Sequence, residues 1–440
     1  MPTVPKGAFV GTAISPPSSA PTWSPTERRP AIDVARIGAL VVVVLGHLTL
    51  AVIDRSPEGA LRGTNLLALR PGWAWIAVCS PMPVFFAAAG WANSTSDLRS
   101  SAPRLRVLVG LGAAVVCSWV ALLATTTIVT GSGGVVALGA RIATQPLWFL
   151  AAYLPFAAAG SPMAWAGRHP MLSVGACMIL LAGLDSARFI GDAPDWIGWP
   201  GFATAWATPW ILGVWWRRRC ERSAFAEVRI GALLAAVGAG TSLLLVNAGG
   251  YSPALIDAVA GARSNTTPPT LYTACAGVAQ VGVLMVVAPL LDRIGRRSRR
   301  WLARAGEAAV GIYLLHLSAL ALCAGVVTLG LPVPTRLTGW WWATRPLWFA
   351  AVLSITAALV VAVEAARTRR PAGDPASPPR AARLWAGVAL VTVGAAVVGL
   401  KGPRTAVTAT ICVVTFALGW WCLGGRLLTP ATYHSAQMPP

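Results

Sequence analysis

The chain has 440 residues, of which 56% are hydrophobic and only 11% are charged, and its formal net charge is +20. Soluble domains carry about 25% charged residues, so this composition excludes a water-soluble globular protein. A basic balance is also typical of nucleic-acid-binding proteins, but here the arginines stand in short clusters between apolar runs, which is the pattern that sets membrane topology. We therefore predict an all-α, polytopic transmembrane helix bundle in a lipid bilayer, with no nucleic-acid partner.

The first 30 residues are rich in Pro, Ser and Thr and lack apolar periodicity. Such a segment cannot bury enough apolar surface to fold, so residues 1–30 are expected to form a disordered cytoplasmic tail. The apolar run 31–53 begins only after Glu27, Arg28 and Arg29. It is longer than the apolar part of a signal peptide and is predicted to be a retained first span.

Apolar stretches of bilayer-spanning length recur along the rest of the chain. We predict twelve spans, with ten or eleven as alternatives because the two shortest, the fourth and the sixth, are candidates for re-entrant segments. The predicted spans are 31–53, 72–92, 107–129, 145–161, 170–188, 200–216, 230–248, 271–291, 307–330, 346–366, 383–400 and 405–424.

The loops between these spans alternate between arginine-rich and arginine-poor up to the last pair. Lys and Arg concentrate in cytoplasmic loops, so the pattern predicts that both termini are cytoplasmic. The arginine-rich stretches are 99–106, 217–229, 293–304 and 367–383. The opposite side carries Trp340, Trp341 and Trp342, which are either interfacial anchors or a platform for stacking sugars.

The Pro-rich stretch 371–379 separates the last two predicted spans from the ten before it. We therefore expect residues 31–366 to form a ten-helix membrane core. Residues 367–440 are expected to hold a linker, two extra non-catalytic transmembrane helices and a short tail.

Three ionisable side chains lie inside the first predicted span, where the bilayer core opposes charge by several kcal/mol. Arg36 and His47 are eleven residues apart, about three helical turns, and Asp33 precedes Arg36 by one turn. All three therefore share one helix face, running from the membrane edge toward its middle. This pattern predicts a buried polar line that faces the bundle interior or a cavity.

Other candidate residues have a structural and a functional interpretation. His316 is a second intramembrane histidine, suited either to an interhelical hydrogen bond or to chemistry. Arg99, Arg104 and Arg106 stand at the predicted cytoplasmic mouth of the third span; they either set topology or, with Arg36, clamp a phosphate-bearing ligand. The sequence shows no metal-ligand spacing, no GxSxG elbow and no Walker loop, so no metal site is predicted.

The first predicted span resembles the first helix of the acyltransferase type 3 family, in which ten residues separate an arginine from a histidine as they separate Arg36 from His47. These are bacterial integral membrane enzymes that acylate envelope glycans, lipids and some secondary metabolites. The similarity extends in order from Ala31 to Glu364. The similar stretches are Asp33-Val-Ala-Arg36, Pro83-Val-Phe85-Phe86 with Gly90, Pro146-Leu-Trp148-Phe149-Leu-Ala-Ala-Tyr153, Pro268-Pro269-Thr270 with Gln280, and Tyr313-Leu-Leu-His316.

Three features depart from the family pattern. Members often carry two arginines separated by two residues before the third span, whereas Arg104 and Arg106 are separated by one and Arg99 lies further back. The fused hydrolase-like domain of some members is absent from this sequence, and the last two predicted spans exceed the common ten-helix core.

The resemblance implies O-acylation, usually O-acetylation, in the inner membrane of a bacterial cell. Acyl-CoA, usually acetyl-CoA, would be a donor substrate rather than a bound cofactor, and the acceptor would be a hydroxyl of a cell-envelope polysaccharide, a glycolipid or a secondary metabolite. His47 would be the general base, Arg36 would bind donor phosphate or the thioester oxygen, and Asp33 would orient Arg36. The other expected donor-binding residues are Arg99, Arg104 and Arg106, and the expected substrate contacts are Trp148, Tyr153, Glu307, Tyr313 and His316.

Two alternatives stay open at this point. The acyl group passes either directly to the acceptor or through a transient acyl-histidine. A transporter or flippase of an envelope precursor would also suit twelve spans and a polar helix face, although such proteins more often show broken helices in two related halves.

Overall fold

The computed structural model describes residues 29–55, 61–70, 72–73, 80–219, 223–255, 263–327, 334–368 and 379–425. The predicted tail 1–30 therefore lies outside the described residues except for its last two positions, as does most of the Pro-rich linker. In chain order the elements are α1 (Pro30–Leu50), β1 (Ala51–Arg55), β2 (Leu61–Asn65), α2 (Leu66–Leu69), α3 (Met82–Ala92), α4 (Leu98–Thr130), α5 (Gly134–Thr144), η2 (Gln145–Leu147), α6 (Trp148–Ala158), α7 (Gly160–Arg168), α8 (Pro170–Phe189), η3 (Asp195–Gly198), α9 (Pro200–Arg219), α10 (Ala224–Gly249), α11 (Leu271–Arg297), α12 (Arg299–Val327), α13 (Gly339–Ala343), α14 (Arg345–Thr368), α15 (Ala381–Lys401) and α16 (Ala406–Cys422).

Long apolar helices dominate the structure, as the composition predicts, and the chain is an all-α, multi-pass membrane protein. Within the described residues nine helical segments are long and apolar enough to cross a bilayer. The other three predicted spans contain α3 and α16, which are shorter apolar helices, and α9, which ends in three arginines. Each predicted span therefore contains a helix.

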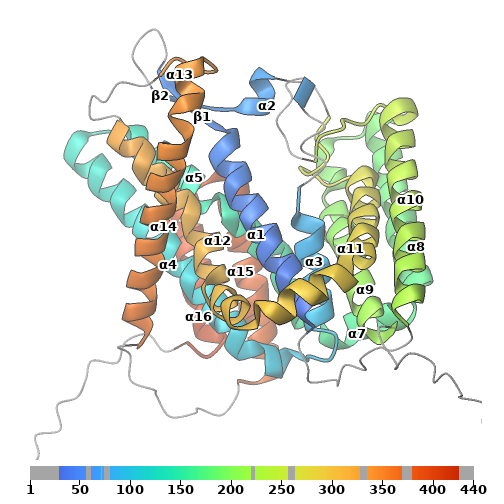
Figure 1. Cartoon of the computed structure of the whole chain (residues 1–440). Coiled ribbons are helices and arrows are strands. Elements are labelled where there is room, and N and C mark those ends of the chain that lie inside the picture. The colour runs from blue at the N-terminus through green and yellow to red at the C-terminus, as the bar shows by residue number, and fades with distance from the viewer. Residues whose placement is uncertain are drawn as a thin grey trace, which may run out of the picture.

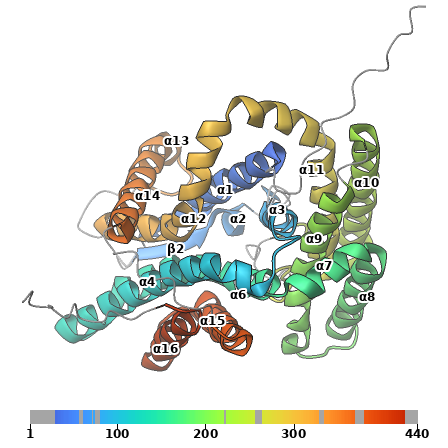
Figure 2. The ribbon, with the colours of Figure 1, turned by 90° about the horizontal axis from the view of Figure 1, so that it is seen from below.

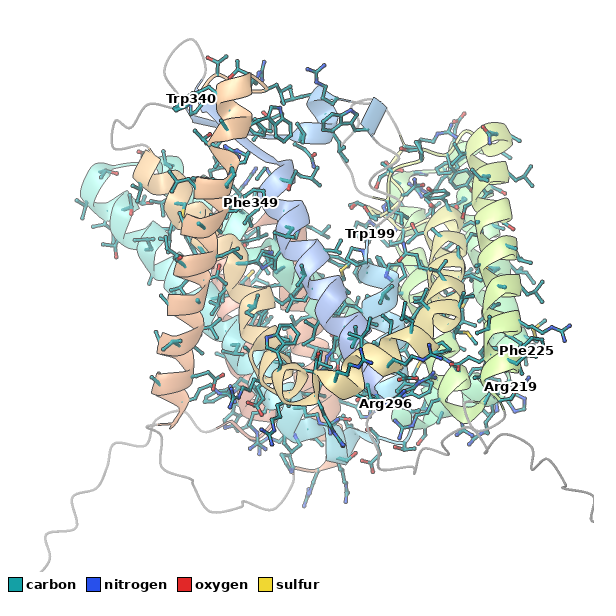
Figure 3. All side chains as sticks on the ribbon, in the orientation of Figure 1. Trp199, Arg219, Phe225, Arg296, Trp340 and Phe349 are labelled. Carbon is teal, nitrogen blue, oxygen red and sulfur yellow. The ribbon has the colours of Figure 1, made fainter. Side chains whose placement is uncertain are left out.

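The bundle has two ends that carry different elements (Figure 1). Arg219 and Arg296 mark the lower end in Figure 3, and Trp340 marks the upper one. We call these the Arg-rich end and the hairpin end, because the β1–β2 hairpin and α13 cover the latter. The first helix, α1, starts at the Arg-rich end and runs to the hairpin end, inside an arc formed by α11 and α12 (Figure 2).

The end of α1 differs from the sequence prediction. The helix stops at Leu50 rather than near Ile53, and the chain enters an antiparallel hairpin in which Val52 faces Thr64. Strand-forming β-branched residues favour this change, and Val52 is fully buried in one cluster with Leu66 and Trp341. His47 consequently lies in the last turn of α1, at the hairpin end of the bundle, and only three residues of the helix follow it.

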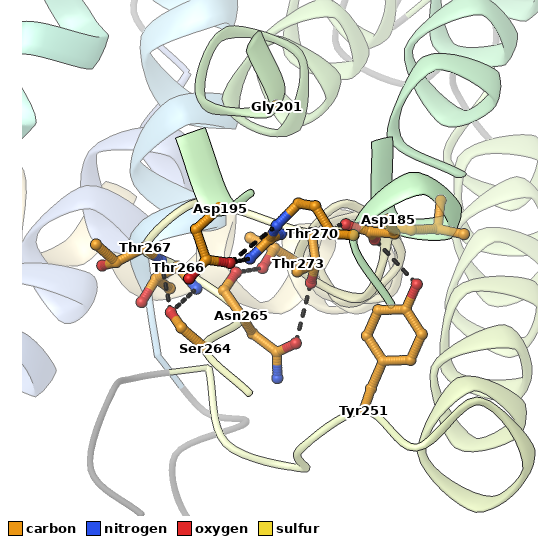
Figure 4. Close-up of polar contacts among 12 residues, drawn as sticks. Asp185, Asp195, Gly201, Tyr251, Ser264, Asn265, Thr266, Thr267, Thr270 and Thr273 are labelled. Atoms are coloured by element: carbon orange, nitrogen blue, oxygen red, sulfur yellow. Dashed lines mark hydrogen bonds and ion pairs between the residues drawn. The ribbon is translucent and has the colours of Figure 1, made fainter. Parts of the chain in front are cut away.

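A polar network holds the hairpin ends of α8 and α11 together (Figure 4). Asp185 accepts hydrogen bonds from the Tyr251 hydroxyl (2.9 Å) and the Leu271 amide (2.7 Å), while Arg188 pairs with Asp195 at 2.9 Å. Burial, together with the Asp185 carboxylate, raises the pKa of Tyr251 above its usual value, so this phenol remains a donor. These acidic residues therefore serve packing at the edge of the bundle.

The last two helices, α15 and α16, form an antiparallel pair that packs along α4 and α6 (Figure 2). Val391 and Phe416 are fully buried in the same apolar cluster as Leu105 and Leu150 of the preceding helices. The pair is thus part of the main core of the bundle.

Candidate active site

The polar face of α1 points into the bundle. The opposite face carries Val41, Val42 and Leu45, which are 47%, 48% and 39% exposed. Arg36 and His47 lie about half a turn away from that face and contact α12. The polar line predicted from the sequence therefore faces α12, but it is not buried along its whole length. The Arg36 and Asp33 side chains keep 37% and 23% exposure, and His47 is the member that meets a fully buried partner.

His47 and His316 form a stacked, hydrogen-bonded pair between α1 and α12. Nδ1 of His47 lies 2.8 Å from Nε2 of His316, and the ring centroids are 5.1 Å apart at 19°. His316 is fully buried, whereas His47 retains partial exposure. The sequence located each histidine separately, but it did not reveal that they are partners.

The carbonyl groups around His316 assign the protons of the pair. Nδ1 of His316 lies 2.8 Å from the carbonyl oxygen of Tyr313 and 3.1 Å from that of Ile312. A carbonyl can only accept, so His316 carries its proton on Nδ1 and accepts at Nε2. Nδ1 of His47 must then donate, which leaves Nε2 of His47 as its basic atom. Nothing in the described part of the chain pairs with that nitrogen.

Arg36 lies between α1 and α12, nearer the Arg-rich end. Its Nη2 donates to the Asp33 carboxylate at 3.2 Å. Gly306 of α12 has no Cβ, and a Cβ added there would lie only 3.0 Å from this Nη2. Glycine at that position therefore allows the guanidinium to approach α12. Nε of Arg36 is buried and has no hydrogen-bond partner among the described residues. The guanidinium thus keeps donor capacity for an anion.

Tyr153 lies within electrostatic range of both Arg104 and Arg36, and the Asn93 side chain lies near its hydroxyl. Asn93 caps the end of α3 and was not among the residues predicted from the sequence. A polar residue directly after a short apolar helix was the available signal.

Aromatic rings connect the arginines to the histidine pair. Tyr153 contacts Phe149 at 5.3 Å between centroids, Phe149 contacts Tyr313 at 5.2 Å, and Tyr313 lies 6.1 Å from His316. Phe85 closes the group against Phe149 and Tyr313 at 6.2 and 6.3 Å. One apolar wall therefore runs from Tyr153 to the histidines.

The remaining predicted donor-binding arginines lie in other surroundings. Nε of Arg106 donates to the Leu423 carbonyl at 2.9 Å, which directs this side chain to the end of α16. Arg99 is exposed in the first turn of α4, next to Asp97, the residue that caps this helix. Their binding of a donor stays a prediction.

Two predicted substrate contacts, Trp148 and Glu307, lie outside the aromatic wall that runs from Tyr153 to the histidine pair. Trp148 packs against Trp206 at 5.6 Å and against α15. Glu307 lines a cavity of about 490 Å³ between α4, α12 and α14, together with Arg304 and Arg367. Glu307 lies nine residues before His316, about half a turn around α12, so that cavity opens on the other side of the helix.

A second charged cluster fixes the start of α1, and the sequence did not predict it. Arg29 is buried between the rings of Trp91 and Trp216, 5.5 and 5.2 Å from their centroids. Its guanidinium pairs with Glu227 at 2.6 Å and with Asp292 at 2.9 Å. The cluster joins α1 to α3, α9, α10 and α11. Among the described residues no group of three His, Cys, Asp or Glu side chains is suited to a metal ion.

Fold and site together define a polytopic membrane protein in which a line of ionisable residues on α1 ends at a pair of hydrogen-bonded histidines. Residues 29–365 match a family model that is described as an acyltransferase domain. This is the type 3 acyltransferase family that the sequence motifs resemble. Because the match covers most of the chain, the protein belongs to this family. No match was found among curated proteins or solved structures. The protein is therefore a membrane acyltransferase, which transfers acyl groups other than aminoacyl groups, and the family favours this enzyme over the transporter alternative.

Proposed function

We propose that this protein transfers an acyl group, in the first instance acetyl, from acyl-CoA to a hydroxyl of a carbohydrate, glycolipid or secondary metabolite. The observation that supports this most strongly is the His47–His316 hydrogen bond, which leaves the other nitrogen of His47 basic and unpaired in the described structure. An alcohol is a weak nucleophile near neutral pH and needs such a base.

The proposed reaction is a balanced acyl transfer. The acceptor hydroxyl gives its proton to Nε2 of His47 as its oxygen attacks the thioester carbonyl. The C–S bond breaks, and the CoA thiolate leaves as the thiol with the proton held by His47. His316 stabilises the imidazolium that forms, because its Nε2 accepts from Nδ1 of His47 throughout. In the acyl-histidine variant of this reaction, Nε2 of His47 attacks the thioester, the C–S bond breaks and CoA leaves as the thiolate. The acceptor hydroxyl then attacks the acyl-imidazolium, the N–C bond breaks, and the hydroxyl proton passes to the thiolate.

The distance between the proposed charge-binding and acid–base groups favours a long donor. Arg36 and His47 are eleven residues apart on α1, about 16 Å along the axis. Acyl-CoA carries its phosphates and its thioester at opposite ends of a flexible arm. Its phosphates would bind Arg36 and Arg104 at the Arg-rich end, and the arm would follow the wall from Tyr153 to Tyr313.

We further propose that the protein lies in the inner membrane of a bacterial cell, with both termini in the cytoplasm. The Arg-rich end would then face the cytosolic pool of acyl-CoA. The acceptor would approach His47 from the hairpin end, only one helical turn away, which suits a cell-envelope substrate.

Mass spectrometry of envelope extracts from cells with and without the gene tests the proposal through an added acyl mass on the acceptor. His47→Ala is expected to lower transfer by on the order of 10²-fold or more, because the base is lost. His169→Ala is the matched control, since His169 packs against Trp165 at the α7–α8 junction. Normal acylation by a membrane-inserted His47→Ala variant would reject the mechanism.

A further inference from the structure

The α15–α16 pair lies beyond the family match but contacts the helices that carry the candidate site. A Cβ at Gly399 of α15 would lie 2.7 Å from Cβ of Trp148 on α6, and a Cβ at Gly112 of α4 would lie 2.8 Å from Phe416 of α16. These helices are close-packed, so a shift of the pair must move α4 or α6.

Two contacts hold α16 against one face of α4. Nε of Arg106 donates to the Leu423 carbonyl at 2.9 Å, and Gly424, with a φ of 85°, leaves room for this guanidinium. One turn later on α4, the indole nitrogen of Trp420 would lie 3.2 Å from a Cβ at Gly110. The end of α16 therefore contacts α4 at two consecutive turns.

The same contacts determine which way Arg104 points. Arg104 and Arg106 are two residues apart, about 200° around the helix axis, so they project from nearly opposite sides of α4. With Arg106 bonded to α16, Arg104 is left on the opposite side of α4, within electrostatic range of Tyr153.

We propose that the α15–α16 pair positions the donor-binding arginine: Arg106 and Trp420 fix the rotation of α4, and Arg104, set by that rotation, binds the acyl donor. This rests on the proposed function, in which Arg104 contacts donor phosphate. Arg106 is then a positioning residue, and the extra helices, although remote from the histidines, control donor affinity.

A double-mutant cycle on the full-length protein tests this, with radiolabelled acetyl-CoA as the probe and equilibrium dialysis as the measurement. Arg104→Gln is expected to raise the Kd by about tenfold, since a charge-assisted contact is lost. Arg106→Gln is expected to raise it by about threefold to fivefold, and the double variant to match Arg104→Gln alone, because Arg106 acts only through Arg104. Arg106→Lys keeps a donor for the carbonyl and should restore most of the affinity.

Matched controls separate the α4 contact from the general stability of the helix pair. Arg383 donates to the Trp421 carbonyl within the pair, so Arg383→Gln should leave the Kd unchanged. Trp420→Leu should raise the Kd without removing any arginine, whereas Trp421→Leu, at a neighbouring residue that is 48% exposed, should not.

Each outcome decides between defined alternatives. An unchanged Kd for Arg106→Gln, or effects that multiply in the double variant, would overturn the positioning role, the second result indicating direct donor contact by Arg106. If the wild type does not bind acetyl-CoA, the donor assignment of the proposed function fails instead. In that case amide hydrogen exchange across residues 98–112 tests whether α16 holds α4. Arg106→Gln and Trp420→Leu should accelerate the exchange, and Arg383→Gln and Trp421→Leu should not. Equal exchange in all variants would reject the contact between α16 and α4 as a positioning device.

Discussion

The first helix carries an inward-facing polar group at each end, and the two differ in how completely they are paired. At the Arg-rich end, Arg29 meets two carboxylates and two indole faces, so its donors and its charge are satisfied. At the hairpin end, His47 uses one ring nitrogen on His316 and keeps the other basic.

This difference distinguishes a residue that only holds helices together, which we call an anchor, from a residue that can react. A buried ion that is fully paired has nothing left to offer a substrate, but removing it leaves its partners without a counter-charge. A histidine with one oriented and one unoccupied nitrogen holds a defined tautomer and can still accept a proton. Arg29 and His47 are both ionisable residues of a membrane protein, and only their neighbouring side chains distinguish their roles.

The largest effect is expected when Arg29, the fully paired residue, is removed. Arg29→Ala should lower the free energy of unfolding by about 3–5 kcal/mol, because Glu227 and Asp292 lose their counter-charge inside the bundle. Thermal unfolding in detergent measures the loss, with exposed Arg219→Ala as the control. A wild-type melting temperature for the alanine variant would show that the cluster is not an anchor.

The histidine pair should respond in activity rather than in stability. His316→Leu leaves Nδ1 of His47 without an acceptor, so the ring loses its tautomer and orientation. Acyl transfer is expected to fall by on the order of 10²-fold, about 2.7 kcal/mol. His316→Gln supplies an amide oxygen in place of Nε2 and should retain more activity. Equal rates for the wild type and His316→Leu would remove His316 from the mechanism.

A smaller effect is expected where one hydrogen bond of the anchor is removed and the rings are kept. Trp216→Phe loses the indole donor to Glu227, at 2.5 Å, but preserves a ring beside Arg29. The expected loss of stability is about 1–1.5 kcal/mol. Trp215→Phe is the control, because the ring of Trp215 contacts the exposed Arg219. If Trp216→Phe lowered the stability as much as Arg29→Ala, the hydrogen bond to Glu227 would matter as much as the ion pairs, which would contradict this prediction.

The smallest effect should come from a group that is paired but exposed. Hydrogen bonds from the Ser100 amide and hydroxyl hold the pKa of Asp97 below its usual value of 3.8. The stabilisation of the α4 start is therefore fully present above about pH 4 and is lost as the pH falls through the lower folded-state pKa. Asp97→Ala should lower the melting temperature slightly at pH 7 and have less effect in acid. A larger effect in acid than at neutral pH would contradict this assignment.

The sequence predicted the face shared by Asp33, Arg36 and His47, because helical periodicity is local and intramembrane charge needs an interior environment. It did not predict the β-hairpin at Ala51, since a short apolar run of β-branched residues continues an apolar helix equally well by composition. The actual neighbours of His47 and Arg29 were also beyond reach. Their partners lie 269 and 263 residues along the chain, on helices whose mutual rotation no local pattern contains.

By itself the sequence determined that this protein spans a membrane, where its helices lie, and which side of the first helix must face inward. These follow from the cost of exposing apolar groups to water and charged groups to lipid, and both costs act residue by residue. Only the tertiary structure decided which histidine meets which, that Arg29 is an anchor, and that Arg106 bonds the end of α16. Those outcomes depend on how distant helices pack, which is set by the shapes of many side chains at once.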